Sequence, residues 1–490
     1  MKRIAATAPR RSLVLVATVV AALSAAAAAT AAPYAPNDPL APRQWHLAAS
    51  RAFDFWESLP ALRRVRVAVI DSGVDGAHPD LAGRVVAHRS FVGGSALEDT
   101  QGHGTFVAGL IAAQTGNGLG IAGMAPSADL VIAKVVDADG TIDVLQEAKA
   151  IRWAVDRGAR VINMSLGGLR DPGRPERDTY AAAEAAALAY AKRRGVVVVA
   201  SVGNSDAAPR QPWPYASYPA ALPHVLGVAA VARDGSVPRF SNRDRIHTDL
   251  AAPGQALLST VPLALTAQFR DCAEQGYSSC AAADVRAGEG TSFAAAQVSA
   301  AAAVILATHP HLRPEQVTGL LTRTAADATR ATGCGVCTLG RDDATGWGRL
   351  DVAAALRDAA ARRLPPRDAY EPNDGAGEQA FKVWGRATRR LAATLDYWDD
   401  RNDVYAVRLV RGQALFASLR GTAGTNAELV LREPGGEWRV DGKARAIRRA
   451  ARPGPDQYLA YRAQRTGWHF VQVRLGTPGA GRYGLALVKE

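Results

Sequence analysis

The sequence has no internal repeat and only four cysteines. We see no membrane span beyond the N-terminal segment. Apolar and charged residues make up 48% and 21% of the chain, as in globular proteins. Since 490 residues are too many for one ordinary core, we expect two or three folding units.

The N-terminal segment has the pattern of a secretory signal peptide over residues 1–32. Basic residues at positions 2, 3, 10 and 11 precede the apolar run Ser12–Ala28, and Ala29-Thr30-Ala31 forms a small-x-small cleavage site. An uncleaved anchor is the alternative, because the run is near spanning length. The alanine content of the run and the small-x-small site at its end favour cleavage, so we expect the mature chain to be secreted and extracellular.

The positive charge is uneven, and much of the formal net charge of +12 falls after residue 365. A local basic cluster could attach the protein to a polyanionic cell surface. Aromatic residues do not alternate with these basic residues, so the pattern favours a solvated face and gives no support for a nucleic-acid partner. The cluster consists of Lys443, Arg445, Arg448, Arg449 and Arg452.

The four cysteines predict two disulfides in an exported protein, with three connectivities open. We favour the local pairs Cys272–Cys280 and Cys334–Cys337. The second pair has the spacing of a redox motif, but nothing around it indicates a thioredoxin-like unit. A zinc site would need further ligands that the sequence does not place.

Apolar strands alternate with helical segments between residues 65 and 324. We expect strands at 65–70, 129–135, 161–164, 196–201, 224–231 and 249–252, and helices at 104–113, 142–157, 179–194, 292–308 and 314–324. This alternation predicts an α/β fold with a doubly wound, mostly parallel sheet and helices on both faces. Ligands bind such sheets beyond the carboxyl ends of the strands.

The chain changes character near residues 362–368, where a Pro- and Arg-rich linker is expected. The strands expected after it are short and alternating, at 404–410, 414–419, 428–431, 458–461, 469–473 and 483–488. Turn residues separate them, which is typical of a small all-β sandwich. We therefore expect a domain at residues 33–364 and a C-terminal β-sandwich domain at residues 365–490.

The stretch Gly288–Ala300 places Ser292 at the start of an alanine-rich helix. A serine there can simply cap the helix, but it can also act as a nucleophile if a base lies within reach. His103, flanked by glycines, is the candidate base, and Asp71 at a strand end is the carboxylate that would orient it. Asn204 follows another buried strand and can donate to an oxyanion.

Three sequence blocks around these residues resemble the signature blocks of the subtilisin-like serine proteases, in that family's order. The resemblance spans about residues 36–360, and two further blocks and a closing motif match as well. The blocks are Asp71-Ser72-Gly73-Val74, His103-Gly104-Thr105, Gly290-Thr291-Ser292-Phe293-Ala294, Val202-Gly203-Asn204, Asp249–Gly254 and Gly346–Asp351.

The resemblance implies a serine endopeptidase that acts on protein or peptide substrates through an Asp71–His103–Ser292 triad and an acyl-enzyme. Asn204 would bind the oxyanion. Ser165, Leu166 and Gly167 would pair with extended substrate backbone. No organic cofactor is implied, and we expect a monomer. The alternative is a catalytically silent, protease-like binding or adhesion protein.

The resemblance also implies a structural calcium site. Asp38, Asp80 and Asn117 would supply side-chain ligands, with the carbonyls of Thr115, Leu119 and Ile121 completing an all-oxygen set. The alternative is that Asp38 and Asp80 are ordinary turn residues.

The sequence departs from the family pattern in several places. Ala296 and Gln297 stand where Pro-His is usual, Ala300 replaces a glycine, and Phe293 replaces a common methionine. Residues 261–287 have the length of an insertion. We find no long inhibitory pro-segment before residue 37, although many secreted relatives have one.

The C-terminal residues 368–490 resemble the bacterial pre-peptidase C-terminal domain. The resemblance rests on the opening run Asp368–Asp374, on Asp400-x-x-Asp403-Val404-Tyr405 and on the late Gly481-x-Tyr483-Gly484. It implies a β-sandwich accessory unit that serves substrate or surface attachment.

Overall fold

The computed structural model describes residues 32–205, 208–266, 285–361, 368–371, 373, 380–385, 388–398, 400–434 and 446–490. Several predictions therefore concern residues outside the described ranges. They are the signal peptide up to residue 31, residues 267–284 of the predicted insertion with the Cys272–Cys280 pair, residues 362–367 of the predicted linker, and Lys443 and Arg445 of the basic cluster.

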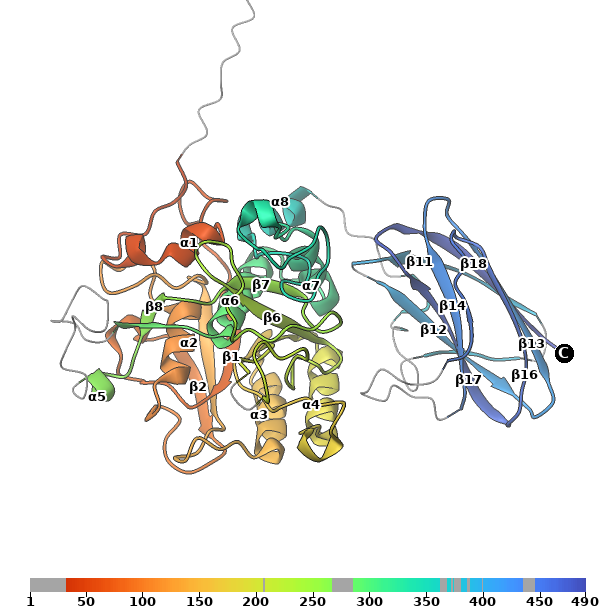
Figure 1. The fold of residues 1–490 in the computed structure, drawn as a ribbon, viewed down its shortest axis with the longest axis horizontal. Coiled ribbons are helices and arrows are strands. Elements are labelled where there is room, and N and C mark those ends of the chain that lie inside the picture. Colours follow the sequence, from red (N-terminus) through yellow and green to blue (C-terminus); the bar gives the residue numbers. More distant parts are fainter. Residues whose placement is uncertain are drawn as a thin grey trace, which may run out of the picture. The chain divides into compact units, whose positions relative to one another are not determined.

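A seven-stranded sheet, with strands between residues 65 and 253, forms the centre of the region between residues 32 and 361 (Figure 1). Its strand order is β2-β3-β1-β4-β5-β6-β7, and all neighbouring strands run parallel. The predicted α/β fold with a parallel sheet is confirmed. The strands are β1 (Val65–Asp71), β2 (Val85–Ser90), β3 (Ala128–Lys134), β4 (Val161–Met164), β5 (Val197–Ser201), β6 (Val225–Val231) and β7 (Leu250–Pro253).

Helices cover both faces of this sheet, and the side chains of β1 pack against helices on each face. Val67 and Val69 pack into a core shared with helices α2 and α6, whereas Ala68 and Ile70 pack into a second core shared with α3 and α4. Successive side chains of a strand point to opposite faces, so the apolar run of β1 serves two cores. The helices of this region are α1 (Trp45–Ala49), α2 (His103–Ala112), α3 (Val144–Asp156), α4 (Ala182–Arg193), α5 (Leu263–Thr266), α6 (Thr291–Thr308), α7 (Pro314–Arg323) and α8 (Val352–Ala361).

Helix α6 is buried from its first residue to Ala307. A helix that is apolar all round belongs in a core, and small alanine side chains let α6 lie close to the strands beneath it. By length and composition alone α6 could cross a membrane, but 94% of that stretch is buried inside the protein. Its apolar character is therefore that of a core helix.

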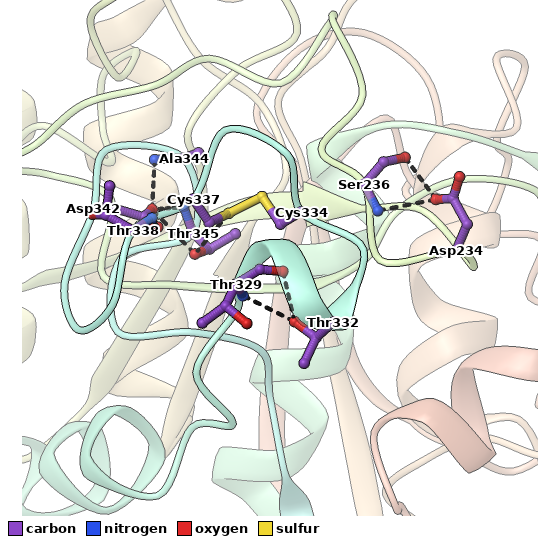
Figure 2. The surroundings of a disulfide bond; sticks show 10 residues. All are labelled: Asp234, Ser236, Thr329, Thr332, Cys334, Cys337, Thr338, Asp342, Ala344 and Thr345. Atoms are coloured by element: carbon purple, nitrogen blue, oxygen red, sulfur yellow. Dashed lines mark hydrogen bonds between the residues drawn. A yellow bond between two sulfur atoms is a disulfide. The ribbon is translucent and has the colours of Figure 1, made fainter.

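A short hairpin and a disulfide complete this region. The strands β8 (Leu257–Thr260) and β9 (Val285–Gly288) pair antiparallel just before α6. Cys334 and Cys337 form a disulfide in the loop after α7, as predicted (Figure 2).

The described residues after 380 form two further sheets, and the prediction of an all-β unit is confirmed. Tyr405 and Val407 of one sheet and Leu415 and Ala417 of the other belong to the same buried core. All pairs are antiparallel except β10 with β12. The five-stranded sheet has the order β10 (Phe381–Val383), β12 (Asn402–Leu409), β17 (Gly467–Leu475), β14 (Ala427–Arg432) and β15 (Ala446–Ala450), and the four-stranded sheet β11 (Arg389–Asp396), β18 (Ala480–Lys489), β13 (Ala414–Gly421) and β16 (Gln457–Arg462).

Candidate active site

The candidate residues gather where the strand order of the parallel sheet reverses. From β1 the chain continues to β2 and β3 on one side, and β4 to β7 follow on the other side. Asp71 ends β1, and Ser165 follows the last residue of β4. Such a switch point is where open α/β sheets bind their ligands.

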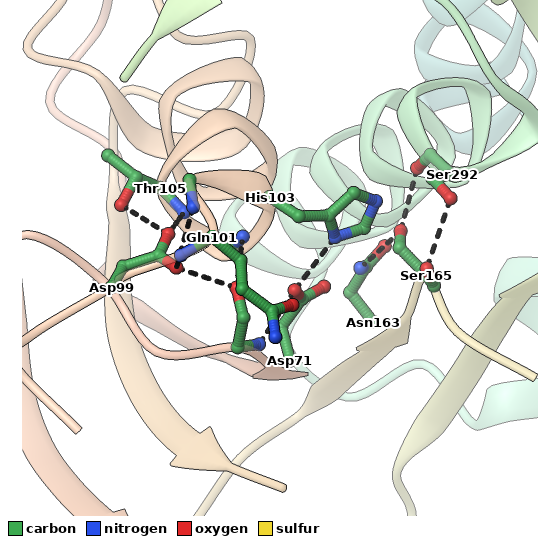
Figure 3. A network of polar contacts seen from close by, with 11 residues as sticks. Asp71, Asp99, Gln101, His103, Thr105, Asn163, Ser165 and Ser292 are labelled. Atoms are coloured by element: carbon green, nitrogen blue, oxygen red, sulfur yellow. Dashed lines mark hydrogen bonds and ion pairs between the residues drawn. The ribbon is translucent and has the colours of Figure 1, made fainter. Parts of the chain in front are cut away.

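Asp71 and His103 are hydrogen-bonded to each other (Figure 3). Nδ1 of His103 lies 2.7 Å from Oδ1 of Asp71, and the Asp71 side chain is almost wholly buried. The backbone N–H of Ser72 donates to the same oxygen at 2.8 Å. With its proton held at Nδ1 by the carboxylate, the neutral imidazole presents Nε2 as an acceptor.

The surroundings of His103 favour its charged form. Burial lowers the pKa of His103, but the charge of Asp71, the hydrogen bond to Asp71 and the charge of Asp99 together raise this pKa above its ordinary value. A raised pKa strengthens the imidazole as a base, because the imidazolium it forms is stabilised.

Gly104 explains why a glycine must follow His103. A Cβ atom at this position would lie 2.1 Å from the carbonyl oxygen of Gly73 and 3.2 Å from Oδ1 of Asp71. A glycine lets helix α2 approach the end of β1 closely enough for the contact between His103 and Asp71.

Ser292 lies in the first turn of α6, and Figure 3 shows His103 between it and Asp71. Its hydroxyl donates to the carbonyl oxygen of Ser165 at 3.0 Å, and the Ser165 hydroxyl donates to the carbonyl oxygen of Ser292 at 2.7 Å. Asn163 extends this network, since its Nδ2 donates to the Ser165 hydroxyl and its Oδ1 accepts from Ser299. These bonds fix the first turns of α6 to the end of β4.

Asn204 is anchored to the residue before Ser292. Its Oδ1 accepts from both the backbone N–H and the hydroxyl of Thr291, at 2.9 and 2.8 Å. Gly203 precedes it at φ 100°, and a Cβ there would lie 2.3 Å from the Ser217 hydroxyl. Because the oxygen of the Asn204 amide is committed to Thr291, its Nδ2 is the group left to donate.

The segment from Ser165 to Gly167 continues from β4 toward the surface. Ser165 is buried, Leu166 is half-buried and Gly167 is exposed. The next residue, Gly168, exchanges two backbone hydrogen bonds with Tyr218. The segment is thereby held with exposed backbone beside Ser292.

Three of the predicted calcium ligands, Asp38, Asp80 and Asn117, lie close together at the loop from Thr115 to Ile121. Asp38 accepts from the backbone N–H groups of Gly116 and Asn117, at 2.7 and 3.2 Å. Asp80 accepts from the backbone N–H of Ile121 at 2.8 Å and from the side chain of Asn117 at 3.1 Å.

Asp38 and Asp80 are both buried, unlike most turn aspartates. Burial raises the pKa of Asp80 to about 6, and the charge of Asp38 adds to the rise while the hydrogen bonds from Ile121 and Asn117 oppose it. Two buried carboxylates beside one loop fit an oxygen-ligand cation site. In this structure, N–H groups make the hydrogen bonds to the two carboxylates. Leu119, another predicted ligand, is largely exposed, and its N–H donates to Oδ1 of Asn117.

Two features of the site were not predicted. Asp99 lies four residues before His103 and is bonded to the turn that leads into α2. An aspartate just before a helix is a common capping signal, so this residue could have been found. The role of Gln297 could not have been found from the sequence. Its side chain donates to the carbonyl oxygens of Pro253 and Phe293, and the contact with Pro253 exists only in the folded chain.

Comparison with known proteins places this geometry among proteases. A sequence model described as the subtilase family matches residues 63–348. Thermitase of Thermoactinomyces vulgaris is 37% identical over 236 residues, which are 47% of this chain and 77% of that protein. Subtilisin DY of Bacillus licheniformis is 36% identical over 264 residues, which are 54% of this chain and 84% of that protein. A solved protease structure from Pseudoalteromonas arctica PAMC 21717 matches with a TM-score of 0.53 and 27% identity, over 66% of this chain and 100% of that chain.

Proposed function

Because the chain belongs to the subtilase family and is a subtilisin-like serine endopeptidase, we propose that it cleaves proteins through Asp71, His103 and Ser292. The observation that carries this assignment is the 2.7 Å hydrogen bond between buried Asp71 and Nδ1 of His103. It orients an imidazole base toward Ser292, which lies in the first turn of the buried helix α6.

In the proposed reaction the Ser292 hydroxyl attacks the scissile carbonyl carbon while Nε2 of His103 takes the hydroxyl proton. The imidazolium then gives this proton to the leaving amine, which departs and leaves an acyl-enzyme on Ser292. Water attacks the acyl group in the second half, again with His103 as base. Asp71 stays ionised throughout and stabilises the imidazolium.

The oxyanion would be held by two donors, Nδ2 of Asn204 and the backbone N–H of Ser292. The anchoring of Asn204 through its oxygen supports this role, since preorganised donors need no reorientation during the reaction. The N-terminus of α6 adds a favourable dipole at the same place.

Substrate would bind along Ser165, Leu166 and Gly167 as an added strand. The exposed backbone of Gly167 supports this, because an open strand edge pairs with extended peptide. The substrates would thus be loops or unfolded segments of other proteins.

A structural calcium ion would be held by Asp38, Asp80 and Asn117, with the carbonyls of Thr115, Leu119 and Ile121. The two buried carboxylates support this proposal, since a divalent cation would offset the cost of burying them. The ion would supply stability to the loop and no chemistry.

We further propose that the protein is secreted as a monomer, with a peptidase domain at residues 33–364 and an accessory β-sandwich domain at residues 365–490. The sequence of residues 1–32 supports secretion. Surface attachment would use the basic residues of the sandwich, of which Arg448, Arg449 and Arg452 are exposed.

The test compares the purified mature chain with Ser292→Ala and Asn204→Ala, using casein and a chromogenic peptide p-nitroanilide in the presence of calcium. Ser292→Ala should lower kcat by roughly 10⁶-fold, and Asn204→Ala by roughly 10²- to 10³-fold with little change in KM. A fluorophosphonate probe should label the parent protein on Ser292 and leave Ser292→Ala unlabelled. If the folded parent and Ser292→Ala were equally inert and unlabelled, the protein would be a silent member of the family.

A further inference from the structure

Asp99 is a buried carboxylate that accepts five hydrogen bonds (Figure 3). Its Oδ1 accepts from the Ser72 hydroxyl at 2.8 Å and from the backbone N–H groups of Gln101 and Gly102, at 3.2 and 2.8 Å. Its Oδ2 accepts from the backbone N–H and the hydroxyl of Thr105, at 2.8 and 2.7 Å. One side chain therefore fixes the turn on both sides of His103.

Ser72 connects this carboxylate to the strand end that carries Asp71. The Ser72 hydroxyl donates to Asp99 and accepts from the backbone N–H of Gly104 at 2.9 Å, while the Ser72 N–H donates to Asp71. The two members of the Asp71–His103 pair are thus attached to one another through Asp99 and Ser72 as well as directly.

Asp99 also supplies negative charge where a helix begins. His103 is the first residue of α2, and Gly102 before it has no side chain to cap the helix. A helix N-terminus carries a partial positive charge that opposes a cation. A protonated His103 at this end would be disfavoured, and a carboxylate bonded to the same turn offsets that effect.

We propose that Asp99 is a positioning residue of the triad, which fixes the orientation of His103 and stabilises its protonated form during catalysis. This inference rests on the proposed role of His103 as the base. The charge of Asp99 is one of the influences that raise the pKa of His103, after those of Asp71.

The experiment replaces the carboxylate by its uncharged isostere, in Asp99→Asn. Without the negative charge the imidazolium is less stable, so the acidic limb of the pH profile of kcat/KM should move to lower pH, by roughly 0.5 to 1 unit. The kcat at the plateau should fall roughly 10- to 100-fold, with KM within about twofold. Asp99→Ser also lacks the charge and carries the same expectation if the asparagine variant does not fold.

Asp342 offers a matched control in the loop after the disulfide (Figure 2). It is buried and accepts from the backbone N–H groups of Thr338, Ala344 and Thr345 and from the Thr345 hydroxyl, at 2.7 to 3.1 Å. Asp342→Asn removes a similarly bonded carboxylate that has no bond to the triad. Its acidic limb should coincide with that of the parent protein.

An NMR titration of His103 in the Ser292→Ala background tests the inference without hydrolysis. The pKa of His103 should fall when Asp99→Asn is added and stay unchanged when Asp342→Asn is added. If Asp99→Asn left the titration and the acidic limb in place, Asp99 would have a structural role only. An inert but folded parent protein would instead count against the proposed function, and the titration would still decide the role of Asp99.

Discussion

Two buried carboxyl groups, Glu147 in α3 and Glu184 in α4, are hydrogen-bonded to each other on the face of the sheet opposite α6. Their exposed fractions are 4% and 3%, and Oε1 of Glu147 has no hydrogen-bond partner among the described residues. Two carboxylates this close cannot both ionise without strong repulsion. We therefore predict that Glu184→Gln stabilises the protein at alkaline pH and not at acidic pH.

The magnitude follows from the pKa of Glu184. Burial raises this pKa from 4.5 to about 7 in the folded protein, although the hydrogen bond from Glu147 opposes the rise. Between these two values the folded state holds a proton that the unfolded state has lost, so the free energy of unfolding decreases as the pH rises. At about 1.36 kcal/mol per unit, the full loss is about 3 kcal/mol, and it is complete above pH 7.

A glutamine at position 184 cannot ionise, and its amide can still bond to Glu147. At pH 8, Glu184→Gln should raise the free energy of unfolding by about 2 to 3 kcal/mol, and at pH 4.5 the two proteins should be equally stable within about 0.5 kcal/mol. The assay is urea unfolding at pH 4.5, 6 and 8, in the Ser292→Ala background to prevent self-digestion. Glu176→Gln, at an exposed glutamate of the same region, is the control and should change nothing. The reasoning is refuted if the stabilisation is absent, or equal at all three pH values.

The sheet could be predicted from the sequence because most of its strands are buried on both faces. Strands β1, β3, β4, β5, β6 and β7 are largely apolar, and the structure places each within a residue or two of its predicted range. Strand β2 was missed, because its burial alternates and it contains His88 and Arg89. An edge strand of this kind lacks the apolar run on which the prediction relied.

The helix boundaries were harder to predict, because they depend on capping contacts and the sequence reveals only some of these. The helix expected at 142–157 begins at Val144, because the Asp143 side chain accepts from the N–H of Leu145 and starts the helix there. Helix α4 begins at Ala182, three residues later than expected, and has no side-chain cap. Helix α8 was missed, since Val352–Ala361 is short and lies close to the linker.

The candidate site residues could be proposed from the sequence where a residue of a suitable chemical type lies at a strand end or a helix start. Asp71, His103 and Ser292 each follow a strand end or begin a helix, and those are positions that the sequence reveals. The supporting contacts could not be predicted in the same way. Asn163 and Ser299 meet only because β4 lies beneath α6, and that contact spans more than a hundred residues of the chain.

Two further predictions concern stability. A chelator should lower the stability of the Ser292→Ala protein in urea. Adding Asp38→Asn should abolish this effect of the chelator, since the proposed calcium ion would lose a charged ligand. If the chelator changed the urea unfolding of neither protein, the result would contradict the calcium site. Gln297→Ala should cost about 2 to 3 kcal/mol, because it removes donors 2.5 and 3.1 Å from the carbonyl oxygens of Pro253 and Phe293 and leaves a buried gap. Its kcat should stay within about threefold, because Gln297 lies more than one turn beyond Ser292 and bonds to none of the triad side chains. A large loss of kcat at unchanged stability would show instead that the family's usual residues at this part of α6 act on the acyl-enzyme.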